Sequence, residues 1–595
     1  MFKADTLKKH ETSVDHKHAV EARSLNESKA WQKSVVTPCA KAEQSVVSAM
    51  KIIYLQAKED LATKKFGALK DLCVELGCST LVGLNATSNI SYESYDSVRD
   101  MEAAMALLIQ EEIIGRVQKA RWFSIMIDEC TDVSIEQSLI IYVRFVHKGK
   151  VFMHYLCLVE TEGASAKELY TCLIKTLEKL NIDVSKCSSL ATDGPSVMRG
   201  IRAGVAALLK MCNPHLLSVH CVSHRLALAS SQAAAEFNYL VKYQDILKRV
   251  HSYFEKSPAN TKRLKQAQNQ SKVLKLSATR WLSLGTSVLN MECNWSALIS
   301  VFSEDKRPVA QGLLKQMASF MFIATTAMLN DVMFSVNRLS LALQKQNLDF
   351  QFAQASVTAC IENLESMRNK TGTHFMDFLD KIPKNVGEHF EFDSHIVSDN
   401  IKQRKRFQSL MEDFLTSVIA NIQDRLGDME NISIFNILLP SCLPNTSTEM
   451  ETYGKAEILE ISKLLQLNSS DLLCEWGLFK RMMHKKFRGM SLKELLDFMF
   501  VNEMNMEYPL MCSLVEYAVT IPLHTADCER GFSALNLIKT DIQNRISLAN
   551  VNNILMIKIE GPERRNFNFG EAFKKWASLK ERRILNSKPK CFDDK

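Results

Sequence analysis

The fold class is decided by residues 121–160, RWFSIMIDECTDVSIEQSLIIYVRFVHKGKVFMHYLCLVE. Short apolar runs separated by polar and turn-forming residues are typical of strands, and they predict strands at 122–127, 138–146 and 151–159. The last two runs flank His147-Lys148-Gly149-Lys150, a short connection that contains glycine, so we expect them to form a hairpin. The stretch therefore predicts a three-stranded meander.

The segments after this meander alternate between helix and strand patterns. Apolar residues on one face predict a helix around 169–180, and further helices are expected around 205–209 and 225–234. Strands are predicted at 188–192 and 216–221. Three strands followed by helix, strand, helix, strand and helix is the order of the ribonuclease H-like fold. From about residue 253 to 500, amphipathic helical patterns replace the strand patterns. We therefore predict an α/β plus all-α protein, in which an RNase H-like mixed-sheet core is interrupted by a large helical insertion.

The composition excludes several classes of protein. The chain has 595 residues, of which 46% are hydrophobic and 24% charged, so neither a disordered nor a collagen-like chain fits. The longest uncharged apolar stretch, 316–330, is shorter than the roughly 20 residues that cross a bilayer, so we expect no membrane span. No apolar segment follows the basic start, so we expect no secretory signal, and the 16 cysteines are expected to be reduced. The net charge of +7 is compatible with nucleic acid without demanding it.

Two acidic residues follow predicted strands directly. Asp128 and Asp193 come at the carboxyl ends of the runs at 122–127 and 188–192, where ligands bind in sheets that contain parallel strands. Two carboxylates on adjacent strands indicate either a divalent metal site or a shared proton. The structural alternative for each is a cap of a turn or helix. Glu529 offers a third carboxylate, although Cys528-Glu529-Arg530 by itself is ordinary helix surface.

Five motifs in order carry a resemblance to a known family. They are FSIMIDECTD (123–132), LATDGPSVM (190–198), HCVSHRLAL (220–228), TRW (279–281) and CERGFS (528–533). Over roughly residues 95–562 the chain resembles the hAT superfamily of cut-and-paste DNA transposases, especially the zinc-finger-bearing host proteins derived from them. The resemblance implies an RNase H-like catalytic domain, a helical insertion, and a terminal segment that completes the core and supports dimerisation.

The resemblance also implies roles for individual residues. Asp128, Asp193 and Glu529 match the three catalytic acids, which would hold Mg²⁺ or Mn²⁺ if the protein is active. Cys221 and His224 match a motif near the active site, where we expect packing and positioning, because two ligands do not make a structural zinc site. Arg280 and Trp281 match a pair whose indole stacks on an extruded DNA base. Without the resemblance, a core tryptophan would be the better interpretation.

Other basic and histidine-containing segments give weaker indications. His10 and His16 (or His18) resemble the helical half of a zinc finger, but no cysteine precedes His10, so zinc binding is not expected. Basic runs occur at 402–406, 480–488 and 574–583. Arg404, Lys405 and Arg406 in the first are predicted to contact DNA and resemble a nuclear-import signal, although such runs are more often solvated helix faces.

Three functions compete for the whole chain. Retention of the three acids favours a Mg²⁺-dependent DNA transposase or nuclease. The incomplete finger favours a domesticated protein that is nuclear and DNA-associated, forms a homodimer or higher homo-oligomer, has nuclear protein partners and lacks full transposition activity. A third, scaffolding role has no direct support. Where the family often has Gly-Trp-Thr after the first acid, this chain has Glu129-Cys130-Thr131, and alternation places Glu129 on the opposite strand face, so it should not replace Asp128.

We expect the domesticated role, with six segments. They are a partial zinc-finger-like segment (1–25), a helical N-terminal region (26–115), the first part of the RNase H-like core (116–252), the helical insertion (253–500), the core completion and dimerisation region (501–562) and a basic tail (563–595).

Overall fold

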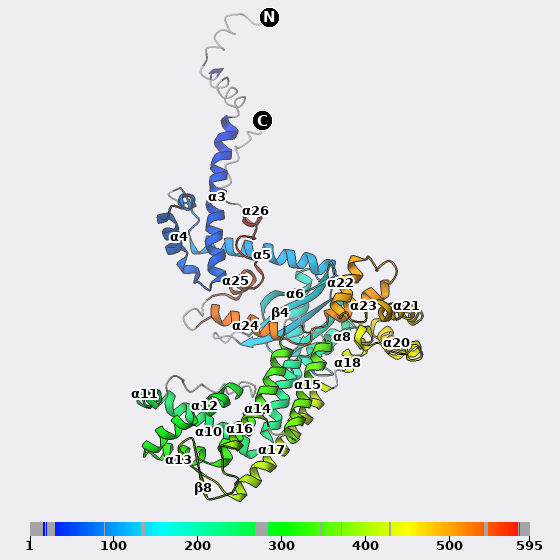
Figure 1. The fold of residues 1–595 in the computed structure, drawn as a ribbon. Coiled ribbons are helices and arrows are strands. Elements are labelled where there is room, and N and C mark those ends of the chain that lie inside the picture. The colour runs from blue at the N-terminus through cyan, green and yellow to red at the C-terminus, as the bar shows by residue number, and fades with distance from the viewer. Residues whose placement is uncertain are drawn as a thin grey trace, which may run out of the picture.

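The structure is a computed structural model centred on one sheet (Figure 1). N-terminal and C-terminal helices pack at one end of the sheet, and a long helical lobe extends from the other. The model describes residues 13, 16, 17, 20, 30–87, 90–131, 137–267, 284–345, 348, 350–369, 372–427, 430–540, 546–580 and 582.

The central sheet has five strands in the order β5-β4-β3-β6-β7. The first three along the chain pair antiparallel, β6 runs parallel to β3, and β7 runs parallel to β6. A meander followed by two parallel strands is the predicted topology, so the α/β plus all-α fold class is confirmed. The strands are β3 (Phe123–Thr131), β4 (Gln137–His147), β5 (Lys150–Glu160), β6 (Cys187–Thr192) and β7 (Leu217–His220).

The predicted hairpin between β4 and β5 has a two-residue turn. His147 pairs with Lys150, and Lys148 and Gly149 between them have φ of 50° and 72°. Positive φ at both central residues is typical of a type I′ turn, which matches the twist of the strands. Glycine is also needed for space, because a Cβ at Gly149 would lie 2.6 Å from Cβ of Phe500.

The C-terminal part of the chain completes the sheet core. Helix α23 (Pro509–Thr520) lies against β3, β4 and β6. The Tyr517 hydroxyl donates to the carbonyls of Ser188 (2.9 Å) and His215 (2.7 Å), and Nε of Arg144 donates to the Val519 carbonyl (3.0 Å). These bonds join segments about 300 or more residues apart and fix α23 to the sheet.

Helix α25 (Leu548–Glu560) covers the free edge of β5. The backbone N–H of Leu158 donates to Oδ1 of Asn552 (2.8 Å), and the N–H of Tyr155 donates to the Glu560 carboxylate. A sheet edge with unpaired N–H groups invites pairing with other chains, and α25 removes that opportunity.

The segment after α25 contains a further helix. Helices α3 (Ala30–Lys58), α5 (Tyr95–Lys119) and α26 (Phe569–Leu579) pack together with α25. Helix α26 lies inside the segment expected to be a basic tail. It is ordered because Phe569, Phe573 and Trp576, spaced at helical intervals, are buried in the core despite the basic composition around them.

The helical insertion forms a second hydrophobic core that spans residues 222–426. Its larger helices are α9 (Val222–Ala235), α10 (Asn238–Glu255), α12 (Leu284–Glu304), α14 (Phe320–Leu343), α15 (Phe350–Asn369) and α17 (Ile401–Ile422). Helix α14 is long and apolar enough to cross a membrane, but 89% of its most apolar window is buried in this core. A short hairpin, β8 (His389–Phe392) and β9 (His395–Ser398), interrupts the otherwise helical segment.

The last helices of the predicted insertion belong to the sheet core instead. These helices are α20 (Lys455–Leu465), α21 (Ser469–Met482) and α22 (Leu492–Val501). The side chains of Ile458 and Trp476 are buried in the same core as the sheet, and α21 and α22 pack on α23. The second core thus begins at Val222, before the expected boundary at 253, and ends at Leu426, well before the expected boundary at 500, with Leu523 as a further member.

Candidate functional site

Asp128 and Asp193 lie at the carboxyl ends of neighbouring strands. The parallel pairing of β3 with β6 runs as far as Met126 opposite Ala191. The paired stretch ends two residues before Asp128 and Asp193, so each acid follows directly on the paired part of its chain segment. Two carboxylates from distant segments therefore share one edge of the sheet.

Helix α24 (Ala526–Ile538) brings Glu529 to the same edge. It packs on β3 and β4, and a Cβ at Gly531 would lie 2.4 Å from Cδ1 of Ile140, the residue that pairs with Asp128. The buried Cys528 lies within electrostatic reach of two of the acids. Burial raises the pKa of its thiol well above the usual range, and the charges of Asp128, Asp527 and Glu529 raise it further. We call the arrangement of Asp128, Asp193 and Glu529 the acidic edge.

Cys221 ties the two halves of this edge together. Its backbone N–H donates to the carbonyl of Thr192 (3.0 Å), and its Sγ accepts a hydrogen bond from the N–H of Thr525 (3.3 Å). The N–H of Val222 also donates to the carbonyl of Leu523 (2.9 Å). Cys221 thus joins the end of β6 to the residue before α24, and burial raises the pKa of its thiol. These contacts support a positioning function.

Asp193 sits between an acid and a base. Burial raises the pKa of its carboxyl group, and the nearby His224 opposes that rise. Burial also raises the pKa of Glu129, and the charge of Asp193 raises it further. Strand β3 pairs regularly with β4 as far as Thr131, so alternation still places Glu129 and Asp128 on opposite faces of β3. Glu129 nevertheless lies within electrostatic reach of Asp193.

The acidic edge does not form a closed metal site. Oxygen ligands suit Mg²⁺, but no three His, Cys, Asp or Glu side chains among the described residues are placed to hold a metal ion. Oδ1 of Asp128 accepts a hydrogen bond from the N–H of Glu129 (2.9 Å). The side chains as placed therefore do not fit a bound ion, and the Mg²⁺ or Mn²⁺ role of the three acids stays a prediction.

The predicted DNA contacts fall into three groups. Arg280 and Trp281 lie outside the described residues. Arg404 has structural partners, because Nη2 is 2.7 Å from Oδ2 of Asp399 and its guanidinium stacks on the Phe320 ring (5.0 Å). Lys405 and Arg406 are exposed near the start of α17. The guanidinium of Arg406 also lies over the Tyr239 ring (5.9 Å), but unlike Arg404 these two residues are exposed and can meet DNA.

Of the two histidines that resemble half of a zinc finger, the structure describes one. His10 lies outside the described residues. His16 is described, and its backbone N–H donates to Oγ of Ser13 (3.2 Å). Among the residues whose positions are given, no group of ligands suits a zinc ion. The expectation that this segment does not bind zinc stays a prediction.

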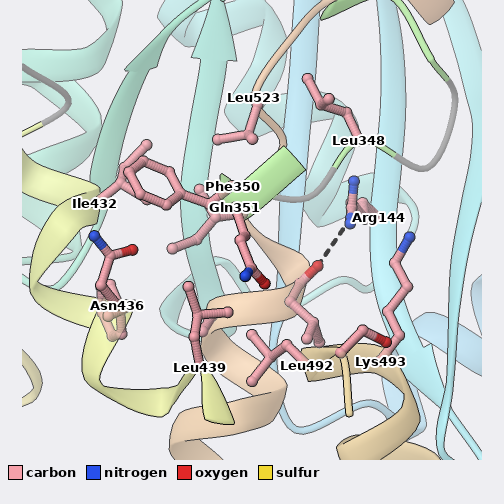
Figure 2. A pocket seen from close by; sticks show the side chains of 15 residues that line it. Arg144, Leu348, Phe350, Gln351, Ile432, Asn436, Leu439, Leu492, Lys493 and Leu523 are labelled. Carbon is pink, nitrogen blue, oxygen red and sulfur yellow. Dashed lines mark hydrogen bonds between the residues drawn. The ribbon is translucent and has the colours of Figure 1, made fainter. Parts of the chain in front are cut away.

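A pocket between the two cores lies apart from the acidic edge (Figure 2). It encloses about 620 Å³, including space open to solvent, and none of the three acids lines it. Arg144 lies on one side, where its bond to the Val519 carbonyl is drawn. The walls are mostly apolar and include Leu348, Phe350, Ile432, Leu439, Leu492 and Leu523. This apolar pocket is thus separate from the candidate site.

Comparison with known proteins supports the sheet assignment. The family described as ZMYM1/FAM200, RNase-like domain (DUF4371) matches residues 75–204, about a fifth of the chain. This range holds Asp128 and Asp193 and ends before Cys221 and Glu529. The chain is also similar to the general transcription factor II-I repeat domain-containing protein 2 of Bos taurus, with 22% identity over 447 residues, 71% of this chain and 46% of the relative. The chain thus spans about half the length of that relative, and it contains an RNase-like domain.

Proposed function

We propose that this chain is a domesticated relative of the hAT transposases that acts as a nuclear, DNA-associated homodimer without full transposition activity. The observation that carries the proposal is the return of α24 to the strand ends that hold Asp128 and Asp193, across the whole helical insertion. An RNase-like domain with this arrangement of acids favours nucleic acid as the partner. The five ordered motifs favour the hAT relationship within that class.

The location and the partners rest on separate observations. The name of the bovine relative includes a general transcription factor, which favours a nuclear location and nuclear protein partners for this chain. Lys405 and Arg406 are exposed, and the net charge is +7, which suits an electrostatic interaction with DNA. The homodimer follows from the hAT relationship; Val551 and Leu555 of the expected dimerisation region are buried within this chain's own core.

DNA strand cleavage or joining is the second candidate function. The convergence of Asp128 and Glu529 on Cys528, with Asp193 on the neighbouring strand, favours it. The test is calorimetric titration of Mg²⁺ and Mn²⁺ into the wild type and into Asp193→Asn. Binding that the variant loses, together with metal-dependent cleavage of DNA, would support the enzyme. Absence of metal binding in both proteins would end this candidate.

The proposed function is tested by DNA affinity and by mass in solution. Fluorescence anisotropy with duplex DNA should show an affinity that falls steeply with salt, because each neutralised phosphate contributes about 0.9 to the slope of log K against log salt. Lys405→Gln with Arg406→Gln should reduce the slope by up to about 2. The matched control is Lys167→Gln with Lys175→Gln, two exposed lysines of α6 (Ala166–Lys179).

Sedimentation of the wild type should give twice the mass of one chain. A monomer that does not bind DNA at low salt would refute the proposal. If the protein is a monomer that binds DNA, the DNA association stands and the homodimer is refuted.

A further inference from the structure

A basic cluster lies directly beside Asp193. Strand β7 ends at His220, His224 follows in the first turn of α9, and their rings are 5.6 Å apart. The chain after Asp193 passes close to both imidazoles, because a Cβ at Gly194 would lie 2.8 Å from Nε2 of His220 and 3.2 Å from Cδ2 of His224. The two rings therefore line the space next to the acidic edge.

Arginines from three elements lie within electrostatic reach of His220. Arg199 ends the short helix α7 (Ser196–Arg199), which starts just after Asp193, and Arg225 follows His224 in α9. Arg425 belongs to a π-helical turn, η5 (Gln423–Gly427), that packs on α9, and its Nη2 donates to Oε1 of Gln232 (2.6 Å). The cluster is thus built by the sheet core and the second core together.

The side chains that shift the pKa of His220 are all basic. Burial lowers the pKa of its imidazole to about 3, and Arg199, His224, Arg225 and Arg425 each lower it further. The carboxylate of Asp193 interacts with His224. His220 is therefore neutral at pH 7, and the three arginines around it create a positive potential in a half-buried site, where charges are screened less than in water.

Two buried N–H groups of the cluster, Nε of Arg199 and Nε of Arg425, have no hydrogen-bond acceptor within the part of the chain that the structure describes. Nε2 of His220 is also buried without a partner there. A buried polar group without a partner is costly, so the site is suited to a ligand that supplies acceptors. An anion with several oxygens would supply both the acceptors and the missing negative charge, and arginine forks match the oxygens of phosphate.

We propose that the basic cluster binds a backbone phosphate of DNA and so holds the strand against the acidic edge. The inference rests on the proposed DNA association and adds the site of contact to it. A phosphate of DNA is favoured over a free phosphate ion for two reasons. The cluster adjoins the acidic edge, and its residues come from both cores, so a strand that lies along the junction of the cores would contact it. The basic cluster consists of Arg199, His220, His224, Arg225 and Arg425.

The test compares Arg199→Gln and Arg425→Gln with the wild type as full-length chains. Each substitution should weaken duplex DNA binding several-fold at 0.1 M salt, equally for unrelated sequences, and reduce the salt slope by about 0.9. Arg199→Lys keeps the charge and should keep the slope. The control is Arg368→Gln, an exposed arginine in the last turn of α15, which should change neither quantity. Equal thermal melting of all variants shows that they are folded.

The outcomes separate this inference from the proposed function. If the wild type binds DNA and both glutamine variants match it, the basic cluster is not the contact, although the DNA association stands. If the wild type does not bind DNA at 0.05 M salt, roughly the low end used for such titrations, both proposals fail. A titration of inorganic phosphate provides a second arm. Phosphate binding that Arg199→Gln loses, with unchanged DNA affinity, would identify a site for free phosphate and overturn the DNA assignment.

Discussion

Replacing Gly531 by alanine should loosen α24 from the sheet and disturb the acidic edge. Two effects oppose each other. Alanine inside a helix is favoured over glycine by about 1 kcal/mol. The added methyl group would lie 2.4 Å from Cδ1 of Ile140 and 2.8 Å from the Tyr142 hydroxyl, and both residues are almost fully buried. Overpacking of this kind costs about 1–3 kcal/mol. The net result should be a loss of about 1 kcal/mol, and Gly531→Val should lose more.

Hydrogen exchange of the peptide 526–538, followed by mass spectrometry, measures the opening of α24 directly. A loss of about 1 kcal/mol corresponds to roughly fivefold faster exchange, since about 1.4 kcal/mol is tenfold. The matched control is Gly115→Ala in α5, where a Cβ would meet nothing within 4 Å. This control should slow exchange in α5 through the helix preference alone. Slower exchange in α24 for Gly531→Ala would show that the helix does not press on β4, and would refute the packing that places Glu529.

Three further substitutions test the core. Tyr517→Phe removes the hydroxyl that donates to the carbonyls of Ser188 and His215, and should lower the free energy of unfolding by about 1–3 kcal/mol; an unchanged melting temperature would contradict these bonds. Asn552→Ala removes the acceptor of two donors on β5 and should cause a similar loss with increased aggregation, measured by melting and light scattering. Burial raises the pKa of Glu102 to about 7 from an unfolded value of 4.5, so the folded state binds the proton more tightly and stability should fall as pH rises between these values. Glu102→Gln should remove this fall, and because it also leaves the buried Arg99 without its ion-pair partner, the test is the pH dependence and not the absolute stability. Parallel melting curves for both proteins from pH 5 to 8 would exclude the linkage.

The middle of the sheet could be predicted from local sequence because a strand such as β4 is buried on both faces. Such strands are nearly continuous apolar runs, and the run at 138–146 became β4, Gln137–His147. The membership of α20, α21 and α22 could not be predicted in the same way. Amphipathic spacing shows that a helix has a buried face, but not which of two cores receives it. The buried aromatic residues of α26 did carry a local signal, which the basic composition around them obscured.

The residues of the candidate site also fall into those that a local sequence pattern predicts and those that it does not. Asp128 and Asp193 could be paired from sequence, because the ends of parallel strands meet at one edge. Glu529 could be added only through the family resemblance, since no local pattern links α24 to that edge. The basic cluster was missed for a similar reason. His220 and His224 stand within a motif that the sequence displays, but Arg425 reaches them from the far end of the insertion.

The covering of β5 by α25 has a consequence for synthesis in the cell. Glu560 lies 405 residues after its partner Tyr155, so at about 5–20 residues per second the ribosome needs roughly 20–80 seconds to deliver the protecting helix. During that interval the edge of β5 in the nascent chain is unpaired and exposed to other chains, and we expect a chaperone to bind it. A transcript truncated before α25 would make this exposure permanent, and its product should accumulate as insoluble material even though every strand of the sheet is present.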